Sequence, residues 1–261
     1  PSVGGVSTGL TTALSPTRLS TDGSHIYFFD ALGGGIYRIP AVGGSPQPVV
    51  STMGSIGSNI LVAGGHVYWS ESSCGVWRAP DSGGVAELVF DPGCGEPWYN
   101  YAHYLQYDSV NQQLVVIVKD GSGGQRQTIY YVDPSTLVPT YGLEIADGPV
   151  AVHDSELFNV FDPWFGTSWA SRVALPTFVQ SPLMDSPWPN EWAGVTNIVA
   201  DSQQVFFGVT MGTNPTPSRV IAVDRCDGHW EHVVYGTPPQ LALDDDYLYL
   251  VYSTEIRRVP R

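Results

Sequence analysis

The sequence predicts an all-β fold, a six-bladed β-propeller in which the N-terminal strand closes the last blade. Three observations lead to this prediction. Short apolar runs alternate with the period of a β-strand, similar units recur every 42 to 47 residues, and the two chain ends carry complementary parts of one unit. Units of this length with about four short strands each are typical of propeller blades. We expect negligible helix.

Three closely matching segments define the repeating unit. Residues 25–30 and 35–40 (HIYFFD and GIYRIP) match residues 66–71 and 75–80 (HVYWSE and GVWRAP), and residues 247–252 and 255–260 (YLYLVY and EIRRVP) form a third copy. In each copy two alternating apolar runs flank a short turn, which is the pattern of a β-hairpin and not of a helix.

One marker residue extends the count from three units to six. An Asp or Gly follows the first apolar strand of each unit, at Asp22, Gly64, Asp108, Asp154, Asp201 and Asp244. A repeated Asp could indicate metal binding. An Asp at a turn also bonds to its own backbone, however, and we interpret these residues as turn formers at the first hairpin of each blade.

The chain ends indicate how the ring closes. Residues 259–261 stop where the first two units continue into a Gly-Gly turn, and residues 1–10 (PSVGGVSTGL) supply that turn and an outer strand. A ring closed by strand exchange requires this offset. We therefore expect one domain, residues 1–261, with blades at about 16–53, 54–92, 97–143, 144–184, 190–236, and 237–261 joined to 1–14.

Three of the units, those of blades one, two and six, resemble a known family. Tyr68-Trp69-Ser70-Glu71, followed by Val76-Trp77-Arg78-Ala79, resembles the YWTD blades of low-density-lipoprotein-receptor-type propellers. Residues 27–30 and 36–38 (YFFD and IYR) are a looser copy, and residues 97–236 show little likeness. The resemblance implies a six-bladed ring. It implies no particular ligand, because these motifs are structural.

The composition excludes several classes of function. The net charge is −14, from 11 basic and 25 acidic residues. Such an acidic surface repels phosphate backbones and anionic lipids, so we expect neither nucleic-acid binding nor membrane insertion. No run of about 18 apolar residues occurs. The chain begins at Pro1 without an initiator Met, which suits a processed protein. We expect a secreted, periplasmic or extracellular location.

The three cysteines have different expected roles. Cys74 lies in the second loop of blade two and Cys94 in the connection to blade three. Both loops belong to the same face of a propeller, so we predict a Cys74–Cys94 disulfide, which suits an oxidising compartment. Cys226 lies near a turn on the opposite face and is expected to be unpaired.

Aromatic loops on the face that carries the inter-blade connections suggest a binding cleft. Five of the eight tryptophans lie in three such loops, within residues 91–101, 162–169 and 184–192. Exposed aromatic rings are costly unless they pack on one another or on a ligand. They could form small satellite cores, or a wall that binds a carbohydrate or another small molecule. The candidate ligand-binding residues are Trp98, Tyr99, Asn100, Trp164, Phe165, Trp169, Asp185, Trp188, Glu191 and Trp192, and Asn190 is a further polar candidate.

Two sets of residues suggest possible chemistry. Asp147-Gly148-Pro149 is similar to the Glu-Gly-Pro opening of calcium-dependent lactonases with six blades, and Asn59, Asp147 and Asn197 could offer oxygen ligands to calcium. Blades one and six carry Arg18 and Gln240 at the matching places. His103 beside Tyr101 could support proton abstraction, as in polysaccharide lyases. No nucleophile elbow, zinc motif or phosphate loop occurs.

Three functions therefore stay open. The first is a binding module for a carbohydrate or another small ligand. The second is an enzyme, either a lyase that uses His103 or a calcium-dependent hydrolase. The third is a scaffold for a protein partner. Bound calcium would favour the hydrolase, and a flat face without a cleft would favour the scaffold.

Overall fold

A computed structural model describes most of the chain. The described residues are 8–11, 16–52, 56–71, 75–92, 101–119, 126–146, 148–161, 169–175, 179–183, 192–211, 219–235, 240–244, 246–251 and 256–260. Within them the chain forms 24 strands and no helix. No helix that could span a membrane was found in this part of the chain.

The strands form six antiparallel sheets of four strands. Blade one contains β2 (Pro16–Thr21), β3 (His25–Asp30), β4 (Gly35–Pro40) and β5 (Gln47–Ser51). Blade two contains β6 (Ile56–Ala63), β7 (His66–Glu71), β8 (Val76–Pro80) and β9 (Glu87–Phe90). Blade three contains β10 (Tyr101–Asp108), β11 (Gln113–Lys119), β12 (Arg126–Val132) and β13 (Pro139–Ala146). Blade four contains β14 (Val150–His153), β15 (Glu156–Phe161), β16 (Trp169–Ala174) and β17 (Val179–Pro182). Blade five contains β18 (Trp192–Ala200), β19 (Gln204–Met211), β20 (Arg219–Asp224) and β21 (Trp230–Tyr235). Blade six contains β22 (Gln240–Leu243), β23 (Tyr247–Val251), β24 (Ile256–Pro260) and β1 (Thr8–Thr11).

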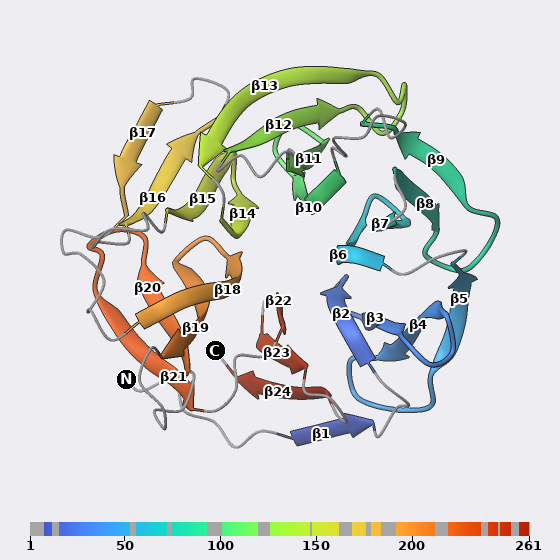
Figure 1. The fold of residues 1–261 in the computed structure, drawn as a ribbon. Helices are drawn as coiled ribbons and strands as arrows, with labels where there is room; N and C mark the ends of the chain where they lie inside the picture. Colours follow the sequence, from blue (N-terminus) through green and yellow to red (C-terminus); the bar gives the residue numbers. More distant parts are fainter. Residues whose placement is uncertain are drawn as a thin grey trace.

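The sheets stand around a central axis, which confirms the predicted six-bladed propeller (Figure 1). The first strand of each blade is innermost, so β2, β6, β10, β14, β18 and β22 surround the axis. One predicted boundary differs. We placed the end of blade three at residue 143, whereas β13 continues to Ala146, because Glu144 and Ile145 still pair with β12 and Ile145 is buried in the core.

The predicted closure of the ring is also confirmed. β1 pairs with β24, with Thr8 opposite Arg258 and Gly9 opposite Arg257, and it is the outermost strand of a sheet that starts with β22. An apolar cluster between blades six and one packs Tyr249 and Ile256 against Phe28 and Ile39. The two ends of the chain are therefore joined by strand pairing as well as by core packing.

The marker residues form the first hairpin turns in two ways. Asp22 Oδ1 accepts hydrogen bonds from the backbone N–H groups of Ser24 (2.8 Å) and His25 (2.6 Å). Asp108, Asp201 and Asp244 accept equivalent pairs of bonds. This bears out the turn-forming interpretation for four of the six blades.

Blades two and four use a different turn. Gly64 and Gly65 have φ values of 56° and 75°, and Asp154 and Ser155 have φ values of 48° and 58°. Two consecutive residues with positive φ form the type I′ turn that fits the twist of a tight hairpin. Asp154 therefore keeps the position of the marker but acts through its backbone conformation.

A repeated arginine joins each of four blades to the next. On the third strand of blade one, Arg38 donates to the carbonyl of Asp81, in the last turn of blade two (3.1 Å). Arg78, Arg172 and Arg258 make the same contact with the carbonyls of Pro134 (2.6 Å), Arg225 (3.2 Å) and Ala41 (3.1 Å). The Arg258 bond crosses from blade six to blade one. Together these bonds form a belt, which we call the arginine belt (Arg38, Arg78, Arg172 and Arg258).

Aromatic residues on the second strand support the belt. Tyr27, Tyr68 and Tyr249 lie directly opposite Arg38, Arg78 and Arg258. The hydroxyl of Tyr27 donates to Asp22 (3.0 Å) and that of Tyr249 to Asp244 (2.6 Å). Burial and the bond to Asp22 raise the pKa of Tyr27 to about 12, so it stays a neutral donor.

Blade five carries a titratable contact near its outer edge. Arg219 Nη1 donates to Nε2 of His232 (3.1 Å), and Trp230 packs edge-on against the imidazole with ring centres 5.3 Å apart. Burial, and secondarily the charge of Arg219, lower the pKa of His232 below its ordinary value of 6.5. The folded protein therefore favours the neutral imidazole over the protonated one.

The belt predicts that Arg78→Met destabilises the protein. The substitution keeps the aliphatic stem but removes a charged hydrogen bond to Pro134, so we expect a loss of about 2 kcal/mol in the free energy of unfolding and a Tm lower by about 4–8 °C. Thermal and urea unfolding measure both. The control is Glu87→Gln, which removes only the half-exposed ion-pair partner of Arg78 and should change stability by less than about 0.5 kcal/mol. Equal effects of the two variants would contradict the belt.

His232 predicts a loss of stability in mild acid. Because its folded pKa lies below its unfolded pKa, the unfolded chain binds the proton first, and this contribution to stability is complete above pH 6.5 and decreases as the pH falls below it. His232→Gln, which keeps an acceptor for Arg219, should flatten the dependence of unfolding free energy on pH between 7.5 and 5. Urea unfolding at several pH values tests this. An unchanged slope in the variant would refute the assignment.

Candidate functional site

The inner strands place a set of polar side chains at one level of the central channel. Five inner-strand residues are equivalent, because each pairs with a fully buried residue in the middle of the second strand: Leu19, Ile60, Leu105, Ile198 and Leu241. The residue before each of them is polar. We call these five residues the polar ring: Arg18, Asn59, Tyr104, Asn197 and Gln240. In blade four, Pro149 takes this place before Val150.

A cavity lies beside the polar ring. It has a volume of about 190 Å³ and is lined by residues of all six inner strands. Asn59, Tyr104, Asn197 and Gln240 line it at one level, and aliphatic residues, among them Val62, line it toward the far end. A water molecule occupies about 30 Å³ in the liquid, so the cavity has room for about six waters or one small ligand.

Several of these side chains also hold neighbouring blades together. Asn59 donates to the carbonyl of Leu105 (2.7 Å) and accepts from its N–H (2.9 Å), and Gln106 donates to the carbonyl of Val150 (3.1 Å). Arg18 Nη2 donates to the carbonyl of Gly57 (2.8 Å). Each of these bonds runs from one inner strand to the next, so the channel wall is stitched from blade one to blade four.

Two members of the polar ring offer open groups to the cavity. No hydrogen bond is recorded for the side-chain amides of Asn197 and Gln240 within the described part of the chain, although both line the cavity. Each amide carries one acceptor and two donors. They are half-buried, so a ligand in the channel can replace the water on these groups.

Arg18 has an unusual backbone. Its φ is 55°, in the left-handed region, and it is the extra residue of a β-bulge between Thr17 and Leu19. Such strain costs about 1–3 kcal/mol and is concentrated at functional sites. Burial lowers the pKa of the Arg18 guanidinium, and the nearby Tyr104 partly offsets this. β10 and β18 carry bulges at the same end of the channel, at His103 and Thr196.

The predicted metal ligands are partly brought together. Asn59 and Asn197 lie in the polar ring, and Asp147 is outside the described residues. Calcium takes six to eight oxygen ligands. Within the described ring it would find three amide oxygens, those of Asn59, Asn197 and Gln240, and the Asn59 oxygen is already bonded to Leu105. The cationic Arg18 lies beside them. In the described part of the chain, no group of three His, Cys, Asp or Glu residues could hold a metal ion.

Most of the predicted binding residues lie outside the described structure. This holds for the side chains or the whole residues of Trp98, Tyr99, Asn100, Tyr101, His103, Trp164, Phe165, Trp169, Asp185, Trp188, Asn190, Glu191 and Trp192, and for Cys74 and Cys94. The strands that flank these segments end at the same end of the blades as the polar ring, because inner strands begin and second strands end on that side. Cys226 is a free, exposed thiol, as predicted.

Tyr104 and Gln106 were not predicted to line the channel. Arg18 and Gln240 were predicted at positions matching Asn59 and Asn197, but only as gaps in a calcium site. Counting back from the marker residue would have found Arg18, Tyr104, Asn197 and Gln240, each four residues before it. Asn59 lies five residues before its marker residue, Gly64, and not four. The different turn at Gly64 shifts the position of the marker by one residue.

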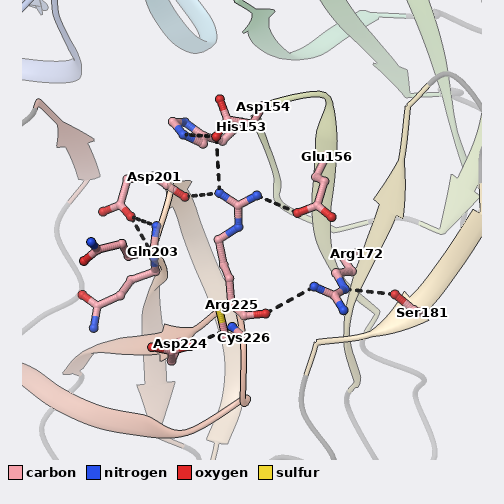
Figure 2. A network of polar contacts seen from close by, with 11 residues as sticks. His153, Asp154, Glu156, Arg172, Ser181, Asp201, Gln203, Asp224, Arg225 and Cys226 are labelled. Atoms are coloured by element: carbon pink, nitrogen blue, oxygen red, sulfur yellow. Dashed lines mark hydrogen bonds and ion pairs between the residues drawn. The ribbon is translucent and has the colours of Figure 1, made fainter. Parts of the chain in front are cut away.

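A second polar network lies at the opposite end of the blades and is structural (Figure 2). Arg225 is 11% exposed and donates to Glu156 Oε2 (2.6 Å) in blade four and to the carbonyl of Asp201 in blade five. Its guanidinium also lies over the ring of Phe158, 5.0 Å from its centre. Arg172 bonds in the other direction to the Arg225 carbonyl. The network therefore fastens blade four to blade five.

Comparisons with known proteins support the architecture. No family model matches the chain, and no curated protein does. Among solved structures, nidogen from a nidogen/laminin complex is 16% identical (TM-score 0.63), with 85% of this chain and 80% of that one covered. A PQQ-bound aldose sugar dehydrogenase from Streptomyces coelicolor is 15% identical (TM-score 0.67; 97% and 96% covered). A gluconolactonase from Xanthomonas campestris is 12% identical (TM-score 0.72; 97% and 88% covered).

These likenesses concern the fold. At 12–16% identity they show that the chain shares the propeller architecture of proteins with different activities. The resemblance to YWTD-type blades is consistent with the likeness to nidogen. The chain is a six-bladed β-propeller whose polar channel end is its candidate ligand site.

Proposed function

We propose that this protein binds a small polar ligand at the polar-ring end of its central channel. The observation that carries the proposal is the pair of open amides, Asn197 and Gln240, facing a cavity of about 190 Å³. Ligand sites are concave, largely pre-formed and supplied with a few convergent polar groups. The cavity is small for such a site. The ligand is therefore either small enough to fit inside the cavity or extends outward from it.

The aromatic loops belong to this proposal as its outer wall. The strands that flank them end at the same end of the blades as the polar ring. We therefore propose that the tryptophans of these loops cover a ligand that extends from the channel. A sugar combines flat apolar faces with hydroxyl groups, so a carbohydrate suits an aromatic wall above an amide-lined cavity. We propose that the protein meets this ligand outside the cell, in line with its acidic composition and the predicted Cys74–Cys94 disulfide.

Catalysis is a second candidate function. It is favoured by the position of Asn59 and Asn197, two of the three predicted calcium ligands, in one ring. In this role a bound calcium would polarise a substrate carbonyl. A role as a protein scaffold is the third candidate, and it requires no channel ligand.

The channel proposal predicts ligand-dependent stabilisation that depends on two amides. A library of monosaccharides, oligosaccharides and small metabolites is screened by thermal shift, with and without EDTA. At 100 times its Kd a channel ligand should stabilise the protein by about 2.7 kcal/mol, which corresponds to roughly 5–10 °C in Tm. Asn197→Leu and Gln240→Met keep the side-chain size and should weaken binding at least about tenfold, as expected when a buried hydrogen bond to the ligand is lost.

The control for this screen is Gln204→Leu, because Gln204 lies at the opposite end of blade five, beside the Asp201 turn. It should leave binding unchanged. Loss of the Tm shift in EDTA would favour the calcium-dependent candidate. The absence of any ligand that depends on Asn197 or Gln240 would refute channel binding.

The aromatic wall predicts a separation of binding from stability. Trp164→Ala, Trp188→Ala and Trp192→Ala should each weaken binding of a hit from the screen while leaving Tm nearly unchanged, because a ring that packs on a ligand contributes little to the unliganded fold. Calorimetric titration and thermal unfolding provide the two readouts. A large fall in Tm with unchanged affinity would instead indicate that these rings form satellite cores.

A further inference from the structure

We propose that the channel ligand is a small hydroxy acid or acidic sugar, whose carboxylate pairs with Arg18 and whose hydroxyl groups bond to Asn197 and Gln240. This inference rests on the proposed function and adds the charge and chemical class of the ligand. Four observations on the described residues carry it: the position of the Arg18 cation, its lack of a carboxylate partner among them, the absence of acidic groups from the described cavity wall, and the open amides nearby.

The first observation is the place of Arg18. Arg18 is not among the residues that line the cavity, but Leu19, the residue after it, lines the cavity. The Arg18 guanidinium bonds to the carbonyl of Gly57, two residues before the cavity-lining Asn59. Tyr104, which lines the cavity, is close enough to contribute to the pKa of Arg18. Arg18 has a left-handed backbone at a β-bulge. A residue with a strained backbone therefore places a cation beside the cavity wall.

The second observation is that no carboxylate contacts this cation in the described part of the chain. Its hydrogen-bond partner there is the Gly57 carbonyl, and Tyr104 lies nearby. By contrast, Arg78 and Arg225 each contact a carboxylate, of Glu87 and Glu156. A guanidinium has five donors, and a partly buried one is costly unless it is paired. A bound anion would supply the missing partner.

The third observation is the lack of negative charge around the cavity. The chain carries 25 acidic residues, yet the described residues that line the cavity include no Asp and no Glu. Other charges on the acidic surface are screened over about 8 Å at physiological ionic strength. An anion in the channel is therefore opposed by no adjacent carboxylate in the described part of the wall.

The chemistry of the ring narrows the kind of anion. Arg forms two parallel bonds to a carboxylate, and one guanidinium balances one negative charge. A phosphate ester carries nearly two charges, and Arg18 is the one cation of the polar ring, so we choose the carboxylate. Asn197 and Gln240 offer neutral donors and acceptors, which match hydroxyl groups. A hydroxylated monocarboxylate therefore fits the described site.

The test compares acids with their neutral counterparts by calorimetric titration. The probes are lactate against propane-1,2-diol, glucuronate against glucose, and inorganic phosphate. For the wild-type protein we expect one of the acids to bind at least about tenfold more tightly than its neutral partner and than phosphate. Arg18→Gln should abolish this preference, Arg18→Lys should retain part of it, and Asn197→Leu should weaken the acid and the neutral compound together. Arg257→Gln, which removes the same charge from β24, should change the preference by less than about twofold.

The outcomes separate the inference from the proposed function. If a neutral compound binds as tightly as its acid, or if the preference is unchanged in a folded Arg18→Gln variant, the carboxylate assignment is wrong and channel binding stands. If phosphate binds most tightly, the anion class is wrong. If none of the probes binds in a manner that depends on Asn197, both the inference and the proposed function are overturned for ligands of this size.

Discussion

The pairing of β1 with β24 is the constraint on which the rest of the molecule depends. Without it the sixth sheet would lack its outer strand, and nothing but side-chain contacts would hold blade six against blade one. The apolar cluster around Phe28 and Tyr249 and the bond from Arg258 to Ala41 add to this closure. A closed ring brings six inner strands to the same level around one axis. The polar ring, whose members are far apart in the sequence, exists only because the ring closes.

The blades are joined mainly near the end opposite the candidate site. The first hairpin turns, the arginine belt and the Arg225 network all lie there, and they are made from short, regular turns with satisfied hydrogen bonds. This division leaves the polar-ring end to the longer connections. A rigid frame at one end and variable loops at the other is how a propeller supports different activities on one architecture, and the structural likenesses to proteins of different activities agree with it.

The channel combines two roles in the same strands. Asn59 and Gln106 use their amides to bind the next blade, whereas Asn197 and Gln240 keep theirs open to the cavity. The stitched half of the wall therefore supports the open half. Arg18 belongs to the stitched half, because it bonds to Gly57. This asymmetry would give a ligand of the proposed kind one preferred orientation in a pseudo-symmetric ring.

The sequence by itself determined the number of blades, the closure by the N-terminal strand and the turn role of most marker residues. These features depend on local patterns, namely the strand period, the spacing of the units and the side-chain chemistry of Asp at a turn. The tertiary structure decided how the polar residues of the channel are used. Bulges within blades three and one set the register of Tyr104 and gave Arg18 its left-handed backbone. Asn59 is bonded to Leu105, which lies 46 residues away in the next blade. A pattern within one blade carries no information about such a contact between blades.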